Sequence, residues 1–84
     1  MGKRYVLSEY VERAMEQALY DKLAEASFSG RIPSCPGVIA FAPSLQECEE
    51  ELRSTLEDWI LVRISERLPI PAIDGIELSV KEVA

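Results

Sequence analysis

The chain has 84 residues, no histidine and a formal net charge of -6, from 15 Asp and Glu against 9 Lys and Arg. Chains of this length form one domain with one small core, which leaves little room for a cofactor fold or a deep cleft. The acidic balance disfavours unaided binding to nucleic acids, because phosphate backbones need a basic surface. The absence of histidine excludes catalytic triads, histidine-based ribonuclease chemistry and histidine-containing zinc sites. We therefore expect a single domain over residues 1–84 that holds no metal and no cofactor.

The cysteine content and the apolar pattern favour a cytoplasmic protein. Cys35 and Cys48 are too few for the disulfide framework of small secreted domains, so we expect reduced thiols in the cytoplasm. The N-terminus turns charged at Glu9 before the apolar stretch of a signal peptide develops. No apolar run is long enough to cross a membrane.

The first predicted element is an amphipathic helix. Apolar residues recur at steps of three and four from Leu7 to Leu19, and charged residues fill the other face. We expect the helix to begin at Ser8, whose hydroxyl is suited to the N-cap. Glu9 then complements the helix dipole in the first turn.

Three short strands follow. Partial alternation predicts antiparallel strands over residues 20–24 and 27–32, joined by a tight turn at residues 25–26. Two prolines and a glycine make residues 33–37 a turn. Residues 38–42 are apolar, with β-branched and aromatic side chains, which is typical of a strand covered on both faces.

A long second helix is predicted by its start signal. Ser44 and Glu47 are spaced as a capping box, and the helical pattern continues to about Glu66. The apolar residues recur on one stripe of this helix. Glu49 and Arg53 are spaced to form an ion pair on the solvent side.

Residues 76–80 alternate between apolar and polar side chains and predict a last strand. The element order is therefore helix, strand, strand, strand, helix, strand. Packing the apolar stripe of each helix on one face of an antiparallel sheet gives an α+β two-layer sandwich.

The second half of the long helix carries four consecutive apolar residues, namely Trp59, Ile60, Leu61 and Val62. Successive helix residues point about 100° apart, so one sheet does not cover all four. We expect this oligomer interface, centred on Leu61 and Val62, to be buried against another chain. The alternative is that the first helix or the C-terminal segment covers it within one chain.

The densest charge cluster consists of Glu47, Glu49, Glu50 and Glu51. One interpretation is an acidic patch that binds a basic partner by electrostatic complementarity. The other is a helix N-terminus that is rich in carboxylates because of the helix dipole and the capping box.

The remaining candidates do not form a catalytic site. Cys35 has no histidine base anywhere in the chain, so we interpret it as a small apolar residue of the core. Asp21, Glu25 and Asp74 are carboxylates of the type that hold metal in nucleases, but they share no recurring spacing. We interpret them as surface residues and expect no catalytic and no metal-binding residues.

A series of short segments resembles the HicB-like antitoxin family, most closely its short stand-alone branch with an extra N-terminal helix. The order and spacing of the segments carry the resemblance more than any single one. The segments are residues 20–21, 28–33, 36–38, 44–48, 52, 56–59, 68–71 and 73–76.

The resemblance implies a partial RNase-H-like fold and a homo-oligomer, either a dimer or a tetramer. It also implies a partner, a small basic HicA-type ribonuclease toxin that the family binds and neutralises. The family often has glycine where this chain has Ala42 and Arg67, and the second difference favours a helix end without a left-handed cap. Full antitoxins add a C-terminal DNA-binding module, for which we expect no room after residue 84, so no direct binding to nucleic acid is expected.

We therefore predict a non-catalytic antitoxin-type protein that covers a toxin, with the acidic patch as its binding surface. One alternative is an orphan homo-oligomeric interaction module. The other is a metal-dependent ribonuclease on an RNase-H-like fold, for which the predicted strands supply only Glu77 as a central carboxylate.

Overall fold

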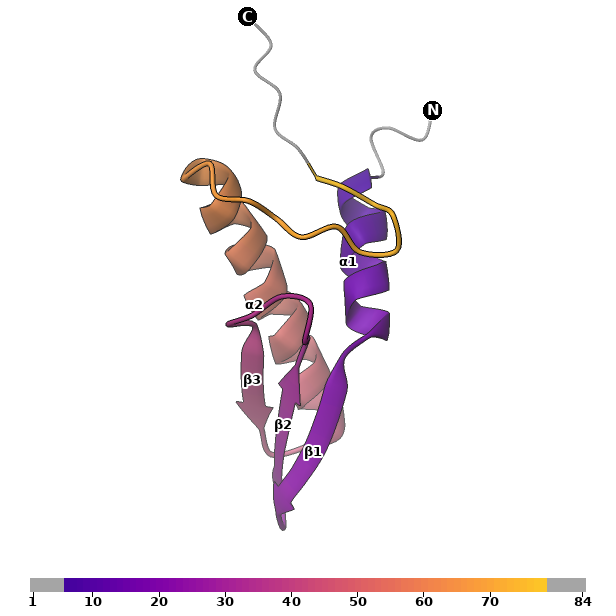
Figure 1. Ribbon diagram of the computed structural model, residues 1–84. Coiled ribbons are helices and arrows are strands. Elements are labelled where there is room, and N and C mark those ends of the chain that lie inside the picture. Colours follow the sequence, from indigo (N-terminus) through magenta and orange to yellow (C-terminus); the bar gives the residue numbers. More distant parts are fainter. Residues whose placement is uncertain (1–5, 79–84) are drawn as a thin grey trace, which may run out of the picture.

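A computed structural model describes residues 6–78. Within this range the elements are α1 (Val6–Glu16), β1 (Leu19–Ala24), β2 (Ser27–Arg31), β3 (Ile39–Ala42) and α2 (Leu45–Ser65). The strands form one antiparallel sheet in the order β1-β2-β3. Helix α2 packs on β3 and β2, and α1 packs on α2 beyond the end of the sheet (Figure 1). The predicted α+β class with an antiparallel sheet is confirmed.

Helix α1 forms because its apolar residues share one stripe. Tyr10, Val11 and Ala14 are buried in the core, as the spacing predicted. The predicted N-cap was wrong, because the helix begins at Val6 and Ser8 lies inside its first turn. The helix also ends earlier than predicted, at Glu16. A tight turn follows, in which the Gln17 amide donates to the Ala14 carbonyl at 3.0 Å, and Leu19 already belongs to β1.

The hairpin of β1 and β2 has the predicted tight turn at residues 25–26, with Ala24 paired to Ser27. Ala26 takes a left-handed conformation with φ of 57°, and the pairing register shifts between Lys22 and Ala24. Further along, Tyr20 pairs with Gly30. A Cβ on Gly30 would lie 2.8 Å from Cε1 of Tyr20, so glycine is what allows the tyrosine ring to lie against this strand.

The structure of β3 contradicts the prediction that this strand is covered on both faces. Ala40 is buried toward α2, and the Cys48 thiol donates to its carbonyl. Ile39 and Phe41 point the other way and are 50% and 66% exposed. The prediction failed because an apolar strand with one open face has the same composition as a strand that is covered twice.

Helix α2 begins as predicted, with Ser44 as its N-cap. The Glu47 amide donates to Ser44 Oγ at 3.1 Å, and the Ser44 hydroxyl donates to the Glu47 carboxylate at 3.0 Å. The core stripe consists of Cys48, Leu52, Leu56 and Ile60. The expected ion pair with Glu49 was wrong, because Arg53 instead contacts Glu12 of α1 at 3.3 Å. The tertiary contact places a carboxylate within reach of this guanidinium, which spacing along one helix does not reveal.

The end of α2 also differs from the expectation. Arg67 follows the C-cap in a left-handed conformation with φ of 58°. The Arg67 amide donates to the Ile64 carbonyl at 3.2 Å, and the Leu68 amide donates to the Arg63 carbonyl at 2.8 Å. This is a Schellman cap formed by a non-glycine residue, and it satisfies two carbonyls that the helix end would leave unpaired.

The segment after α2 runs back across the molecule to α1 (Figure 1). The Tyr10 hydroxyl donates to the Pro71 carbonyl at 2.6 Å, and Ile73 is buried. Only an isolated bridge between Ile73 and Ile76 forms, so the predicted last strand is not present through Leu78, and residues 79–80 lie outside the described range. Hydrogen bonds from Tyr10 to Pro71 and from Gln17 to Asp74 join this segment to α1 and to the turn after it. Within the described chain, neither helix is both long enough and apolar enough to cross a bilayer.

Candidate interaction surfaces

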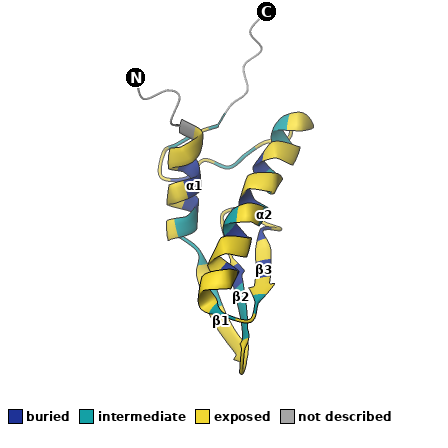
Figure 2. Cartoon of the chain, turned by 180° about the vertical axis from the view of Figure 1, so that it is seen from behind, coloured by how far each residue is buried: buried dark blue, intermediate teal, exposed yellow. Residues whose placement is uncertain are grey.

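The acidic residues at the start of α2 are all exposed. Successive helix residues turn by about 100°, so Glu47, Glu50 and Glu51 share the side of α2 opposite the core stripe. Figure 2 shows this side of the helix as mostly exposed. Glu49 points elsewhere, toward Tyr20, whose pKa is raised by burial and secondarily by the nearby Glu49 charge. The structure therefore brings three of the four predicted residues together.

The two interpretations of this cluster apply to different residues. The Glu47 carboxylate accepts a hydrogen bond from the N-cap hydroxyl, so the helix start accounts for it. The carboxylates of Glu50 and Glu51 make no hydrogen bond and no ion pair with other side chains in residues 6–78. We call Glu47, Glu50 and Glu51 the acidic surface. Its last two charges are not neutralised within the described chain and are available to a basic partner.

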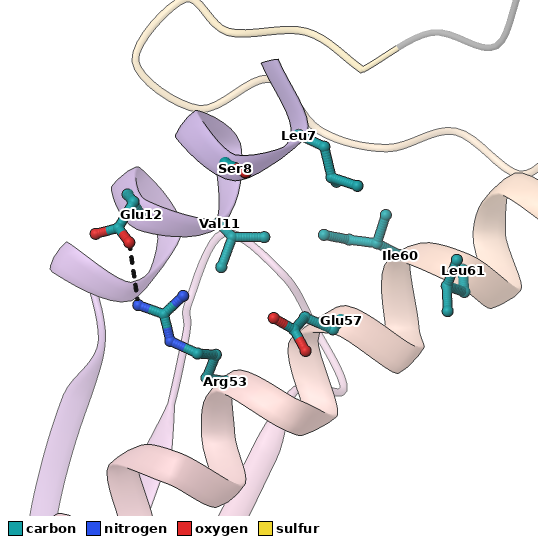
Figure 3. Close-up of a pocket in the computed structure, with 8 residues that line it drawn as sticks. All are labelled: Leu7, Ser8, Val11, Glu12, Arg53, Glu57, Ile60 and Leu61. Atoms are coloured by element: carbon teal, nitrogen blue, oxygen red, sulfur yellow. Dashed lines mark hydrogen bonds and ion pairs between the residues drawn. The ribbon is translucent and has the colours of Figure 1, made fainter. Parts of the chain in front are cut away.

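A groove lies between α1 and α2 and has a volume of about 310 Å³. Figure 3 shows Leu7 and Val11 of α1 facing Ile60 of α2, with the Glu12–Arg53 ion pair at one end. The groove is therefore apolar in its middle and charged at that end. Its lining residues are Leu7, Ser8, Val11, Glu12, Arg53, Glu57, Ile60 and Leu61.

The structure places the four residues of the predicted oligomer interface in different surroundings. Ile60 is 1% exposed and belongs to the core of the chain itself. Trp59 is half-buried, with the Arg63 guanidinium 4.6 Å above its ring. Leu61 and Val62 are 60% and 52% exposed. They point about 100° apart, so only Leu61 lines the groove.

Both cysteines are buried in the core. The Cys35 thiol lies 3.8 Å from the Tyr10 hydroxyl, and the Cys48 thiol lies against Ala40. Burial is the main cause that raises the pKa of both thiols. A buried thiol with a raised pKa is a poor nucleophile, which agrees with the interpretation of Cys35 as a core residue.

The carboxylates considered as metal ligands lie far apart along the fold. Asp21 pairs with Arg31 at 3.2 Å on the sheet, and Glu25 lies in the hairpin turn. Asp74 accepts a hydrogen bond from Gln17 at 3.4 Å. Across residues 6–78, no three His, Cys, Asp or Glu side chains are grouped so that they could hold a metal ion.

Two features were missed from the sequence. One is the groove, which requires the relative placement of α1 and α2. The other is the exposed face of the sheet, where Leu19, Ile39 and Phe41 are all about half exposed or more. The alternation of side chains within residues 38–42 could have revealed this exposed face, if one side of the strand had been assigned to solvent.

Comparisons with known proteins agree on a relationship over most of the chain. The sequence pattern of the family described as UPF0150-like matches residues 9–71. The crystal structure of the protein TTHA0281 from Thermus thermophilus is similar, with 36% sequence identity and a TM-score of 0.85. That similarity covers 92% of this chain and 96% of the other. No curated protein matches.

Proposed function

The chain belongs to the UPF0150-like family, and from this premise we propose that it is a non-catalytic binding protein of the HicB antitoxin type. In this proposal it covers a small basic ribonuclease toxin of the HicA type in the cytoplasm. Its fold would then be the HicB-like, partial form of the RNase-H-like fold. The chain supplies an acidic binding surface, and the ribonuclease chemistry belongs to the partner.

The observation that carries the proposal is the acidic surface on α2. Glu50 and Glu51 are exposed, and neither is neutralised by a cation within residues 6–78. The whole chain has a net charge of -6, so the field around this helix attracts basic proteins. Complementary charge speeds association and selects the partner more than it adds affinity.

The groove between α1 and α2 adds an apolar contact surface to the charged one. Its apolar middle, with Leu7, Val11 and Ile60, is of the type that takes apolar side chains from a bound helix. Glu57 and the Glu12–Arg53 pair provide polar groups at its rim. An apolar groove with an acidic border suits an amphipathic, basic segment of the toxin.

A second candidate function is a homo-oligomeric interaction module without a toxin. The observation that favours it is the exposure of Leu61 and Val62 on α2, which we predicted to be an oligomer interface. Such a module gives a stable homo-oligomer and no basic partner.

The test is co-expression with the product of the neighbouring small reading frame, followed by co-purification. We expect a stable complex with a small basic protein, weakened at least tenfold in the Glu50→Lys/Glu51→Lys variant. The matched control is Glu25→Lys/Glu77→Lys, which changes the net charge equally at two exposed positions away from α2. Recovery of the homo-oligomer alone, or equal weakening by both double variants, would contradict the proposal. Magnesium- or manganese-dependent RNA cleavage by the chain itself would favour the ribonuclease instead.

A further inference from the structure

The sheet ends at β3, whose outer edge has no partner strand within residues 6–78. Hydrogen-bonded and non-hydrogen-bonded pairs alternate along an antiparallel ladder. The Ile32 amide donates to the Val38 carbonyl, so Ala40, two residues further on, also directs its amide and carbonyl toward β2. The amides and carbonyls of Ile39 and Phe41 therefore point away from β2. We call these groups the open edge of β3.

The two edges of the sheet differ in how readily they admit another strand. On β1 the register shifts between Lys22 and Ala24, and the lysine charge lies beside this irregularity. Bulges and lysine side chains are common means by which edge strands resist pairing. Strand β3 has neither, because its four residues are uncharged and pair with β2 without a register shift. Ile39 and Phe41 are exposed, so this edge is accessible to a partner.

A strand added at the open edge would lie next to α2, which packs on β3 and β2. The opposite flank of this helix is turned toward α1 and β1. Arg53 contacts Glu12 of α1 on that flank, and Glu49 lies near Tyr20 of β1. Figure 2 shows β3 and α1 on opposite sides of α2.

The flank of α2 on the β3 side is acidic. Successive helix residues turn by about 100°, so Glu47, Glu51 and Asp58 fall within about 40° of one another. This arc lies on the opposite side of the core residue Cys48 from Arg53. We call Glu47, Glu51 and Asp58 the acidic flank. Glu51 and Asp58 are exposed and form no ion pair with another side chain of the described range.

We propose that the open edge of β3 binds an extended segment of a partner protein in which basic and apolar residues alternate. The segment adds a fourth, antiparallel strand, and its amides and carbonyls pair with those of Ile39 and Phe41. Side chains of a strand alternate between the two faces of the sheet. On one face the basic side chains reach the acidic flank. On the other, the apolar side chains pack beside the exposed side chains of Ile39 and Phe41.

Charge selects this partner over a second copy of the chain. Two copies that paired through β3 would bring their acidic flanks together, and like charges oppose that contact. The described strands also lack the required alternation, because β1 has Lys22 alone, β2 has Arg31 alone and β3 has no basic residue. The inference rests on the proposed function for the source of the segment, the basic toxin, and on the geometry of β3 for the mode of binding.

The test is binding of a synthetic peptide to the full chain, followed by NMR. The probe is a capped peptide of about nine residues in which lysine alternates with valine. Residues opposite Ile39 and Phe41 share their hydrogen-bonded pairs, and on that face they are valines. N-methylation of the valine amides therefore blocks pairing with β3. The matched control carries the methyl groups on the lysine amides, which point away from β3.

We expect the unmethylated peptide to bind with a dissociation constant below about 1 mM and to slow hydrogen exchange at the Ile39 and Phe41 amides. Exchange at the Ala40 amide, which already pairs with β2, should not change. Methylation of the valines should weaken binding at least tenfold, and methylation of the lysines less than threefold. Absence of protection at Ile39 and Phe41, or equal binding of both methylated peptides, would overturn the proposal.

The acidic flank is tested with Glu51→Lys/Asp58→Lys, which should weaken peptide binding at least tenfold. Glu25→Lys/Glu77→Lys changes the net charge equally away from this flank and should weaken it less than threefold. Equal weakening by both double variants would show attraction to net charge alone and overturn the proposal. Circular dichroism establishes folding, and the methylated peptides test the open edge without any variant. A toxin complex that forms although the peptide fails overturns only this inference, whereas peptide binding without a toxin complex contradicts only the proposed function.

Discussion

Tyr10 gives the sharpest stability prediction, because its hydroxyl joins α1 to the C-terminal segment. The side chain is fully buried, and the hydroxyl donates to the Pro71 carbonyl at 2.6 Å. Tyr10→Phe keeps the ring in the core and removes the hydroxyl, which donates to the Pro71 carbonyl and also lies 3.8 Å from the Cys35 thiol. A typical hydrogen bond contributes about 0.5–1.5 kcal/mol net, and a stranded acceptor costs about 1–3 kcal/mol.

We expect Tyr10→Phe to lower the free energy of unfolding by about 1.5 kcal/mol, since the carbonyl is part-buried and regains some water. In a domain of this size that corresponds to a fall in Tm of about 6–12 °C. Urea denaturation, with the slope unchanged, measures the difference directly. Limited proteolysis after α2 should also become faster, because the segment that carries Pro71 loses its anchor.

Tyr20 provides the matched control, because its hydroxyl is buried and has no hydrogen-bond partner in residues 6–78. Removing an unsatisfied hydroxyl is neutral or stabilising, so Tyr20→Phe should leave stability unchanged or raise it by up to about 1 kcal/mol. A loss below about 0.5 kcal/mol for Tyr10→Phe, or equal losses for both variants, would refute the assignment of this hydrogen bond as the anchor.

Three further predictions concern the backbone, the sheet and the pH dependence. Arg67→Gly should raise the free energy of unfolding by about 0.5–1 kcal/mol in urea titrations, because glycine adopts the left-handed cap without strain; a loss would show that the Arg67 side chain contributes more than the strain. Gly30→Ala should cost about 1–3 kcal/mol, since the new Cβ would crowd the Tyr20 ring at 2.8 Å, and an unchanged Tm would contradict this contact. Burial raises the pKa of the thiols of Cys35 and Cys48 and of the phenols of Tyr10 and Tyr20. The unfolded chain loses its thiol protons above about pH 8.5 and its phenol protons above about pH 10, whereas the folded chain keeps them to higher pH. Stability should therefore be full below about pH 8 and fall as the pH rises to about 11, and urea midpoints that stay level over this range would be inconsistent with that burial.

Local signals along the sequence predicted the elements that depend on local physics. The Ser44 cap, the core stripe of α2 and the tight turn at residues 25–26 follow from capping, periodicity and turn length. The start of α1 was missed because Ser8 is a good cap by type, but the helix continues past it to Val6. The left-handed Arg67 was missed because the Schellman hydrogen bonds compensate for a residue that disfavours this conformation.

The candidate surfaces depend on tertiary placement and were therefore harder to predict. The sequence indicated surplus apolar surface on α2, and Leu61 and Val62 are exposed, but Ile60 is buried because α1 and α2 meet there. The cluster of acidic residues was evident, yet the turn of the helix separates Glu49 from the other three. The exposed face of the sheet was missed because composition alone does not tell which side of β3 a helix covers.

The most direct test of the central proposal is inhibition of the neighbouring small basic protein in an RNA cleavage assay. We expect the purified toxin to cleave RNA and an equimolar amount of this chain to abolish the cleavage. The Glu50→Lys/Glu51→Lys variant should need at least ten times more protein, and the Glu25→Lys/Glu77→Lys control should inhibit as well as the unmodified chain. Full cleavage in the presence of a large excess of the unmodified chain would contradict the antitoxin-type proposal.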